Sequence, residues 1–399
     1  MAAPGSGRLL SGDPLLAMRW WQRMAQGAQG QPCSCRVLLL LAGTQTAAVP
    51  GISAAGATPE ARRRTAAADA ELLLLGPERP LPHALPPLPA GVSPALIAHV
   101  VLEELVIEPL VVDLGAPLAP AVPHLRAGRG LASGPAACLS TGAAMGPERV
   151  AGLLALGRRW GQRLARRGHP VVLAECVPGG TSTAQAVLEG LGVEAAGLVS
   201  GSLREPVHTL KAALVQRGLA AAGLTAAGSG AAGAAEAEPP AAAVLAAVGD
   251  PMQALAAGLV QAAAEQELPL LLAGGSQMAA VLALALALTP AAGRPRLLAQ
   301  AGIATTAWVA HESGSDLVAL LGRIAGRWGG EPLAFAAGLR FSGCRSPELQ
   351  AYERGYVKEG VGAGGLALLW EMSGRDPAAL AEACDRACAR LSRASGAPA

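Results

Sequence analysis

Short, mainly apolar runs recur along this 399-residue chain, and they constrain its fold more than any other feature. The run at 36–42 reads RVLLLLA and ends directly before Gly43. A strand buried on both faces has this pattern, because helices cover both sides of a parallel sheet. We expect further strands at 72–75, 105–114, 171–174, 195–200, 268–273 and 303–310.

Helical patterns lie between these runs. We expect helices at 61–70, 94–104, 146–166, 182–190, 205–218, 251–267 and 276–288. Strands that alternate with helices predict an α/β fold with a mainly parallel sheet and helices on both of its faces.

Three segments interrupt this alternation. Residues 76–91 are rich in proline and predict an irregular ordered loop or a linker, and 220–243 is an Ala/Gly-rich insertion. Residues 1–32 are interpreted as a loose extension, or as one short amphipathic helix around 15–24. The expected organisation is an extension at 1–32, an α/β domain at 33–372, and a C-terminal helix with a tail at 373–399.

Composition excludes several classes of function. A net charge of +2 and 3% aromatic residues argue against a nucleic-acid partner, which would need a cationic and base-stacking surface. The apolar window 268–288 is the best candidate for a membrane span, but Pro269 and the polar, glycine-rich stretch 274–277 favour a strand, a turn and a helix instead. The 7 cysteines are scattered, so we expect neither a disulfide framework nor a metal site. No secretory signal is evident, so we expect the cytoplasm.

Ligands of an open parallel sheet bind beyond the carboxyl ends of its strands, so the junctions there matter most. At 171–184 the sequence VVLAECVPGGTSTA ends a strand at Glu175 and opens a helix. The residues that follow Glu175 and could hold a phosphate are Gly179, Gly180, Thr181, Ser182 and Thr183. Glycines let backbone amides approach an anion, and hydroxyls at a helix start add donors. Glu175 could accept hydrogen bonds from ribose hydroxyls. The alternative is a glycine turn whose Thr or Ser only caps the helix.

Two later junctions have a similar form, VGDPMQALAAG at 248–258 and LLLAGGSQMAAV at 270–281. Asp250 either faces a ligand or caps the helix that Pro251 begins. Gln277 either binds a ligand or faces solvent. The candidate ligand-binding residues here are Gly249, Asp250, Gly274, Gly275 and Ser276.

One carboxylate stands in a glycine-rich segment, YVKEGVGAGGLAL at 356–368. Glu359 precedes Gly360 and Gly362, so backbone can approach a ligand closely beside it. An apolar wall there would raise the pKa of the carboxyl toward that of a useful general base. The alternative is a flexible surface turn with an exposed Lys358–Glu359 pair.

Small residues surround Ser53 in the segment 49–71, VPGISAAGATPEARRRTAAADAE, and leave space for a flat ligand or a tight backbone crossing. The three arginines at 62–64 are interpreted as a solvated helix face rather than as an anion clamp.

Five motifs, PGISAAGATPE, ECVPGGTSTA, VGDPMQALAAG, LAGGSQMAA and KEGVGAGG, resemble the nicotinate-nucleotide:dimethylbenzimidazole phosphoribosyltransferase family in their order. They resemble still more a branch related to that enzyme of cobalamin assembly. The resemblance runs from about 36 to 372 outside the insertion. It implies a parallel three-layer αβα sandwich, a small helical lobe built from the terminal segments, and a homodimer.

The resemblance also implies a reaction and roles for residues. Phosphoribose would pass from nicotinate mononucleotide to a ring nitrogen of an aromatic base, without a metal or another cofactor. Glu359 falls on the family's general base, Glu175 and Gly179 on its strand-end motif, and Ser53 on its base-pocket serine. The phosphate-side turns fall on 179–183 and 274–276.

This chain differs from the family pattern at two places. Gly-Gly-Thr-Ser-Thr replaces Gly-x-Gly-Asn-Thr-Thr after Glu175, and the glutamine that accompanies the pocket serine has no match near 61–70.

Two other functions remain open. A transferase that uses phosphoribosyl pyrophosphate would need magnesium, and it would want an acidic neighbour beside Glu175, which the sequence lacks. A nucleotide-binding protein without catalysis would keep the glycine turns but would not need Glu359.

Overall fold

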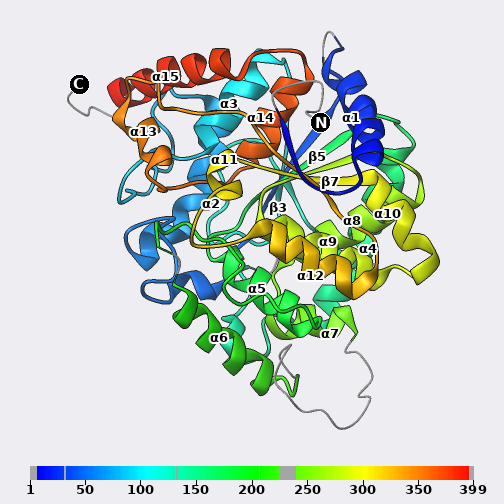
Figure 1. Cartoon of the computed structure of the whole chain (residues 1–399). Helices are drawn as coiled ribbons and strands as arrows, with labels where there is room; N and C mark the ends of the chain where they lie inside the picture. Colours follow the sequence, from blue (N-terminus) through cyan, green and yellow to red (C-terminus); the bar gives the residue numbers. More distant parts are fainter. Residues whose placement is uncertain are drawn as a thin grey trace.

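A mainly parallel eight-stranded sheet forms the centre of the molecule, within the residues that this computed structural model describes, 7–30, 33–128, 130–131, 134–205, 207–224 and 240–394 (Figure 1). Its order is β1-β8-β7-β6-β5-β2-β3-β4, and β1 alone runs antiparallel to its neighbour. The strands are β1 (Arg8–Ser11), β2 (Arg36–Leu41), β3 (Leu110–Asp113), β4 (Leu125–Arg126), β5 (Val171–Cys176), β6 (Leu270–Ala273), β7 (Ala301–Thr305) and β8 (Leu333–Ala336).

Side chains of the central strands alternate between two helical layers. On β2, Val37, Leu39 and Leu41 belong to one buried cluster, while Leu38 and Leu40 belong to the other. The first layer contains α1 (Pro14–Ala28), α2 (Pro59–Leu75), α3 (Ala95–Glu104), α13 (Pro347–Glu353), α14 (Ala363–Met372) and α15 (Pro377–Ala394). The second contains α4 (Pro147–Ala165), α5 (Gly180–Gly190), α6 (His208–Ala221), α7 (Ala241–Val248), α8 (Pro251–Glu265), α9 (Ser276–Leu288), α10 (Arg294–Gln300) and α12 (Leu317–Trp328). The expected αβα sandwich is therefore confirmed.

Residues near the N-terminus are built into the core, which differs from the loose extension expected for 1–32. Trp20 of α1 stacks on Phe335 of β8 with ring centroids 5.1 Å apart, and its indole N–H donates to the Gln300 carbonyl at 3.0 Å. β1 extends the sheet at its β8 edge. Burial of these aromatic rings explains the order, so the amphipathic helix expected around 15–24 is the correct alternative. Residues 1–6 and 31–32 lie outside the described residues.

Several expected strands are wrong, and each error involves a short apolar run. Residues 72–75 continue α2, and 195–200 form turns. Of 303–310, only the start belongs to β7, because the short helix α11 (Ala307–Ala310) follows. A buried helix and a buried strand share such composition, so pattern alone does not separate them. The ends of the Ala/Gly-rich insertion belong to α6 and α7, and 225–239 lie outside the described residues.

The register of the central strands brings their carboxyl ends together. Ala174 of β5 pairs with Ala273 of β6, and Ala273 pairs with Ala304 of β7. The junctions that follow these strands therefore lie side by side at one edge of the sheet.

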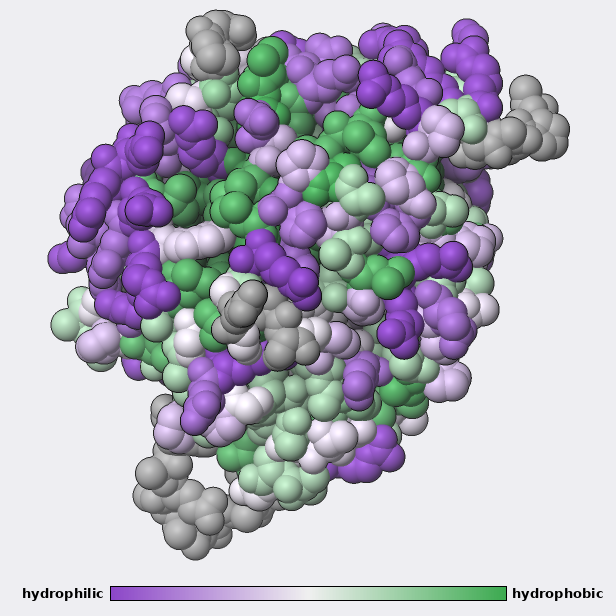
Figure 2. All heavy atoms as spheres, turned by 180° about the vertical axis from the view of Figure 1, so that it is seen from behind, coloured by the Kyte–Doolittle hydropathy of each residue, from purple (hydrophilic) through white to green (hydrophobic). Residues whose placement is uncertain are grey.

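The apolar window 268–288 divides into β6 and α9, as expected from its central glycines. Among the described residues, no helix combines the length and apolar character that crossing a membrane requires. The face in Figure 2 is a mosaic of hydrophilic and hydrophobic residues, with hydrophilic side chains gathered along one side.

Candidate active site

A cavity of about 970 Å³ opens at the carboxyl edge of β5 and β6. Its lining comes from residues 51, 53–55, 65, 69, 85–94, 175–181, 200–205, 207, 275–277, 309 and 356–361. The predicted site residues that it includes are Ser53, Glu175, Gly179, Gly180, Thr181, Gly275, Ser276, Glu359 and Gly360. Segments from opposite ends of the chain thus meet at one place.

Glu359 is fixed at the cavity wall by four hydrogen bonds. One carboxylate oxygen accepts from the Thr305 hydroxyl and the Thr306 amide, both at 2.9 Å. The other accepts from the amides of Gly360 and Gly364, both at 3.1 Å. Burial raises the pKa of this carboxyl, and the four donors oppose that shift. Glu359 is thus an oriented, partly buried carboxylate, and the flexible surface turn with a Lys358–Glu359 pair is wrong.

The backbone that carries Glu359 is strained. Val357, Lys358 and Val361 have positive φ angles of 53–66°. Residues other than glycine rarely adopt this backbone conformation. Each such residue costs about 1–3 kcal/mol, so surrounding contacts must enforce the turn. One of these contacts is the Val361 amide, which donates to the Glu175 carbonyl at 3.0 Å. The turn therefore joins Glu359 to the end of β5.

Glu175 is a second carboxyl at the same wall. Gln277 donates to one of its oxygens at 2.8 Å and the Val177 amide to the other at 3.0 Å. Burial, with the negative charges of Asp250 and Glu359 nearby, raises the pKa of Glu175 to about 8. At neutral pH Glu175 is therefore mainly protonated, and its hydroxyl is available to donate a hydrogen bond.

Two helices begin at the cavity. Gly179 has φ +82° and precedes α5, whose first residues Gly180 and Thr181 line the space. Gly275 precedes α9, which begins with Ser276. The first amides of a helix have no partner within it, and its dipole favours negative charge there. The arrangement suits a phosphate between the two helix starts.

The remaining predicted residues are absent from the lining. Thr183 donates to Asp250 at 2.6 Å, and Asp250 caps α8 in a capping box with Gln253, so the capping alternative holds for Asp250. Ser182 is fully buried within α5. The glycines outside the lining have structural roles: Gly249 ends α7, Gly274 donates to the Ala304 carbonyl at 2.8 Å, and Gly362 lets α14 approach Ala174.

Ser53 lines the cavity but is already engaged by a neighbouring loop. Its hydroxyl lies 3.1 Å from that of Ser202, which also accepts from the Ala54 amide at 2.8 Å. Arg62 donates to the carbonyls of Ala47, Ser53 and Gly56 and is buried. Arg62 therefore shapes the loop that carries Ser53, and the expected solvated face applies only to the exposed arginines at 63–64.

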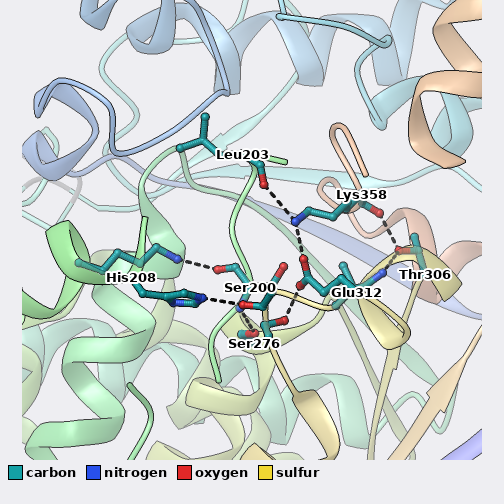
Figure 3. A network of polar contacts seen from close by, with 11 residues as sticks. Ser200, Leu203, His208, Ser276, Thr306, Glu312 and Lys358 are labelled. Atoms are coloured by element: carbon teal, nitrogen blue, oxygen red, sulfur yellow. Dashed lines mark hydrogen bonds and ion pairs between the residues drawn. The ribbon is translucent and has the colours of Figure 1, made fainter. Parts of the chain in front are cut away.

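The loop 200–205 is held by the only two lysines of the chain, Lys211 and Lys358. Both are buried, which is rare for lysine without a partner. Lys211 donates to the Ser200 carbonyl at 2.7 Å, and burial lowers its pKa to about 8. Figure 3 shows Lys358 between the Leu203 carbonyl, 3.1 Å away, and the Glu312 carboxylate.

The same network reaches two of the junctions at the sheet edge. The Ser276 hydroxyl accepts from the Ser200 amide at 3.0 Å, and the Thr306 hydroxyl donates to the Lys358 carbonyl at 2.6 Å (Figure 3). The segment 200–208, which no motif explained, is therefore tied to the start of α9 and to the turn of Glu359.

Two parts of the lining are missing from the sequence predictions. The proline-rich residues 85–94 form an apolar wall, and Asp69 of α2 adds a third buried carboxyl. Asp69 stands within the run TAAADAE, where two acids among small residues on a helix are the available signal. In the ranges described above, no three His, Cys, Asp or Glu side chains gather where a metal ion could bind.

Comparison with known sequences gives the family. A family model described as Phosphoribosyltransferase matches residues 98–302. UPF0284 protein SYNW1869 of Parasynechococcus marenigrum (strain WH8102) is 52% identical over 360 residues, which is 89% of this chain and 87% of the relative. A UPF0284 protein of Prochlorococcus marinus (strain MIT 9313) is 49% identical over 94% of this chain and 89% of its own length.

Comparison with solved structures supports the same fold. The crystal structure of CobT from Thermus thermophilus aligns with a TM-score of 0.54 at 17% identity, over 96% of this chain and 99% of that chain. A structure of nicotinate-nucleotide-dimethylbenzimidazole phosphoribosyltransferase from the same organism also gives 0.54, at 18% identity, over 97% and 99% of the two chains. Together with the sequence matches, these findings show that the chain is a UPF0284 protein of the phosphoribosyltransferase family. It is therefore a pentosyltransferase related to nicotinate-nucleotide:dimethylbenzimidazole phosphoribosyltransferase, the enzyme family that its motifs resemble.

Proposed function

We propose that this enzyme transfers phosphoribose from nicotinate mononucleotide to a ring nitrogen of an aromatic base. The product would be an α-ribazole phosphate, or an analogue of it, for assembly of the lower ligand of cobalamin. The observation that carries the proposal is the oriented carboxylate of Glu359 on a cavity that also receives two helix starts.

The reaction needs one bond to break and one to form at C1′ of the ribose. The bond from C1′ to the pyridinium nitrogen breaks, and its electron pair returns to that nitrogen, so nicotinate leaves with a neutral ring nitrogen. The acceptor nitrogen then bonds to C1′, and Glu359 takes the proton that this nitrogen carried. Positive charge that develops on the sugar in the transition state is stabilised by the nearby Glu359 carboxylate.

The two ends of the cavity suit the two substrates. The phosphate would bind at Gly179–Gly180–Thr181 and Gly275–Ser276, where α5 and α9 begin and the helix dipoles favour negative charge. The protonated Glu175 would donate to a ribose oxygen. The aromatic base would lie against the apolar residues of 85–94.

We propose further that the enzyme acts in the cytoplasm as a homodimer. Sedimentation equilibrium of the purified chain tests the assembly, because a dimer has twice the 39.7 kDa mass of one chain. A mass of one chain at working concentrations would contradict it.

A single assay tests the reaction. The protein is incubated with nicotinate mononucleotide and a panel of benzimidazoles, purines and phenols, and free nicotinate is measured. We expect release that depends on the acceptor and persists with a magnesium chelator. Activity with phosphoribosyl pyrophosphate and magnesium alone would replace the proposal with the other transferase. Tight nucleotide binding with no turnover of any acceptor would identify a binding protein instead.

A further inference from the structure

Asp69 is a buried carboxyl on the cavity wall that the reaction above does not use. One of its oxygens accepts from the Ser93 hydroxyl at 2.6 Å, and the other accepts from the Cys176 thiol at 3.3 Å. Cys176 follows Glu175 at the end of β5, so Asp69 lies close to the reacting edge of the sheet. Burial raises the pKa of Asp69 to about 6, so the carboxyl is mainly ionised at neutral pH.

No cation in the described part of the chain neutralises this charge. None of the ion pairs there includes Asp69, although His83 pairs with Glu71 on the same helix as Asp69. A carboxylate has about four lone-pair directions, and one hydroxyl and one weak thiol donor occupy two of them. A buried charge with so few partners is costly unless a ligand supplies another donor.

Asp69 shares the cavity lining with small and apolar residues. Thr65 lies one helical turn before Asp69 and also lines the cavity, but its hydroxyl donates to the Ala55 carbonyl at 2.5 Å. The segment that carries Ser93 also lines the cavity with Leu85, Leu88 and Val92 and with prolines between them. Asp69 therefore offers an unneutralised acceptor within otherwise apolar or internally bonded surroundings.

This pocket is continuous with the position of Glu359. The side chain of Pro94 at the end of the apolar wall lies 2.9 Å from where a Cβ on Gly360 would stand. The Tyr352 hydroxyl donates to the Val92 carbonyl at 2.8 Å, and the charges of both Asp69 and Glu359 act on it. Asp69 and Glu359 thus line one cavity, so an acceptor whose ring nitrogen faces Glu359 would present a substituent to Asp69.

We infer that Asp69 selects an acceptor with an exocyclic hydrogen-bond donor, an amine or a hydroxyl, over an acceptor with methyl groups only. The inference rests on the proposed function and specifies its acceptor. A methylated ring would displace water from the Asp69 carboxylate and donate no hydrogen bond to it. A ring with an N–H or O–H substituent would donate the hydrogen bond that the carboxylate lacks. A site built for such a donor rejects an analogue that lacks it far more strongly than an apolar pocket rejects an added methyl group.

Binding to the intact chain tests this directly, without turnover. Titration calorimetry compares 5-aminobenzimidazole and 5-hydroxybenzimidazole with 5-methoxybenzimidazole and 5,6-dimethylbenzimidazole. The amino and hydroxyl rings show which donor is preferred, and the methoxy ring keeps the ring-bound oxygen of the hydroxyl ring but has no hydrogen to donate. We expect the better donor-bearing ring to bind at least about tenfold tighter than the methoxy and dimethyl rings.

The variant Asp69→Asn keeps the shape of the side chain and removes its charge. It should abolish that preference while leaving nicotinate mononucleotide binding unchanged. The matched control is Asp113→Asn, a buried aspartate that binds the amides of Gly115 and Ala116 and is absent from the cavity lining. This control should keep the preference.

The outcomes separate the acceptor inference from the reaction. Equal binding of all four rings, tighter binding of the dimethyl ring, or no binding of any ring overturns the role of Asp69. So does an unchanged preference in Asp69→Asn. If the preference is found but no ring is ever ribosylated, the transfer reaction fails while the role of Asp69 in recognition stands.

Discussion

At the scale of single residues, two glutamates at one sheet edge have different environments. Glu359 accepts four hydrogen bonds, whereas Glu175 accepts two and lies near the charges of Asp250 and Glu359. Burial raises the pKa of both carboxyls, and more hydrogen-bond donors oppose that shift at Glu359 than at Glu175. Glu359 is suited to remove a proton and Glu175 to hold one.

Glu175→Gln should stabilise the protein at high pH. The pKa of Glu175 is 4.5 in its ordinary state and about 8 here, so folding favours the protonated form. Its contribution to stability is complete below pH 4.5 and is lost as pH rises toward 8. Glutamine stays neutral, and the unpartnered Oε1 of Gln277 can accept from it if the Gln277 amide turns.

Thermal melting from pH 5 to pH 8.5 measures this effect. We expect the two proteins to melt together at the lower pH and the variant to melt about 2 °C or more higher at pH 8.5. A difference that does not change with pH would show that Glu175 is not protonated at neutral pH.

At the scale of elements, the start of α5 is the test of the phosphate site. Gly179→Val places a branched side chain at φ +82° and brings a Cβ to 3.0 Å from the Ala47 amide nitrogen. We expect binding of nicotinate mononucleotide, followed by calorimetry, to weaken by at least about tenfold, since the amides of this turn would shift.

Gly168→Val is the matched control for backbone strain. Gly168 has φ +71° with no atom near its Cβ position, and it is absent from the cavity lining. Both variants should lose about 1–2 kcal/mol of stability. Equal nucleotide affinity in the two variants would place the phosphate elsewhere.

The second element is the turn 357–361, which Lys358 connects to the loop 200–205. Lys358→Met leaves the Glu312 carboxylate buried without its partner, and this should destabilise the fold by about 3–5 kcal/mol. It also frees the Leu203 carbonyl, so the turn that carries Glu359 should be held less firmly. We expect kcat to fall at least about tenfold, with a smaller change in KM.

The double variant Lys358→Met/Glu312→Gln separates the two effects. Removing both charges should restore most of the stability in a denaturant titration, but kcat should stay low because the tether to Leu203 is still absent. Recovery of kcat along with stability would reduce Lys358 to a structural role.

The sequence reveals those elements whose pattern is local. The strands at 36–42, 171–174 and 268–273, and the junctions that carry Glu175, Gly275 and Glu359, follow from apolar runs next to glycines. The four-residue edge strand β1, RLLS, and the two-residue β4 carry no such pattern, since only pairing with a neighbour makes them strands.

Other site residues depend on tertiary packing. Asp69 and the wall 85–94 reach the cavity although no motif marks them as site residues, and Lys211 acts from outside the lining by holding the Ser200 carbonyl. Asp250, by contrast, lies in a motif, but the motif is ambiguous, because Gly-Asp-Pro fits a ligand site and a helix cap equally. Only the contacts of Asp250 with Thr183 and Gln253 identify it as a cap.

At the scale of the whole molecule, the N-terminal segment should unfold together with the sheet. Trp20 packs on Phe335 of β8 and blocks any side chain at Gly302 of β7. Trp20→Ala should therefore cost about 3–5 kcal/mol in the free energy of unfolding, measured by denaturant titration.

Leu15→Ala is the control, because Leu15 lies on the same helix but is 65% exposed. It should change the stability by less than about 0.5 kcal/mol. A small effect of Trp20→Ala would mean that the segment is an appendage and not part of the cooperative core.

The most direct test of the account is turnover by Glu359→Gln. The substitution keeps the shape of the side chain but removes its ability to take a proton from the acceptor. Nicotinate release in the presence of an acceptor should fall about 10²–10⁴-fold, while the affinity for nicotinate mononucleotide stays that of the unaltered enzyme. Release at the unaltered rate would show that the carboxylate on which the mechanism depends is not its base.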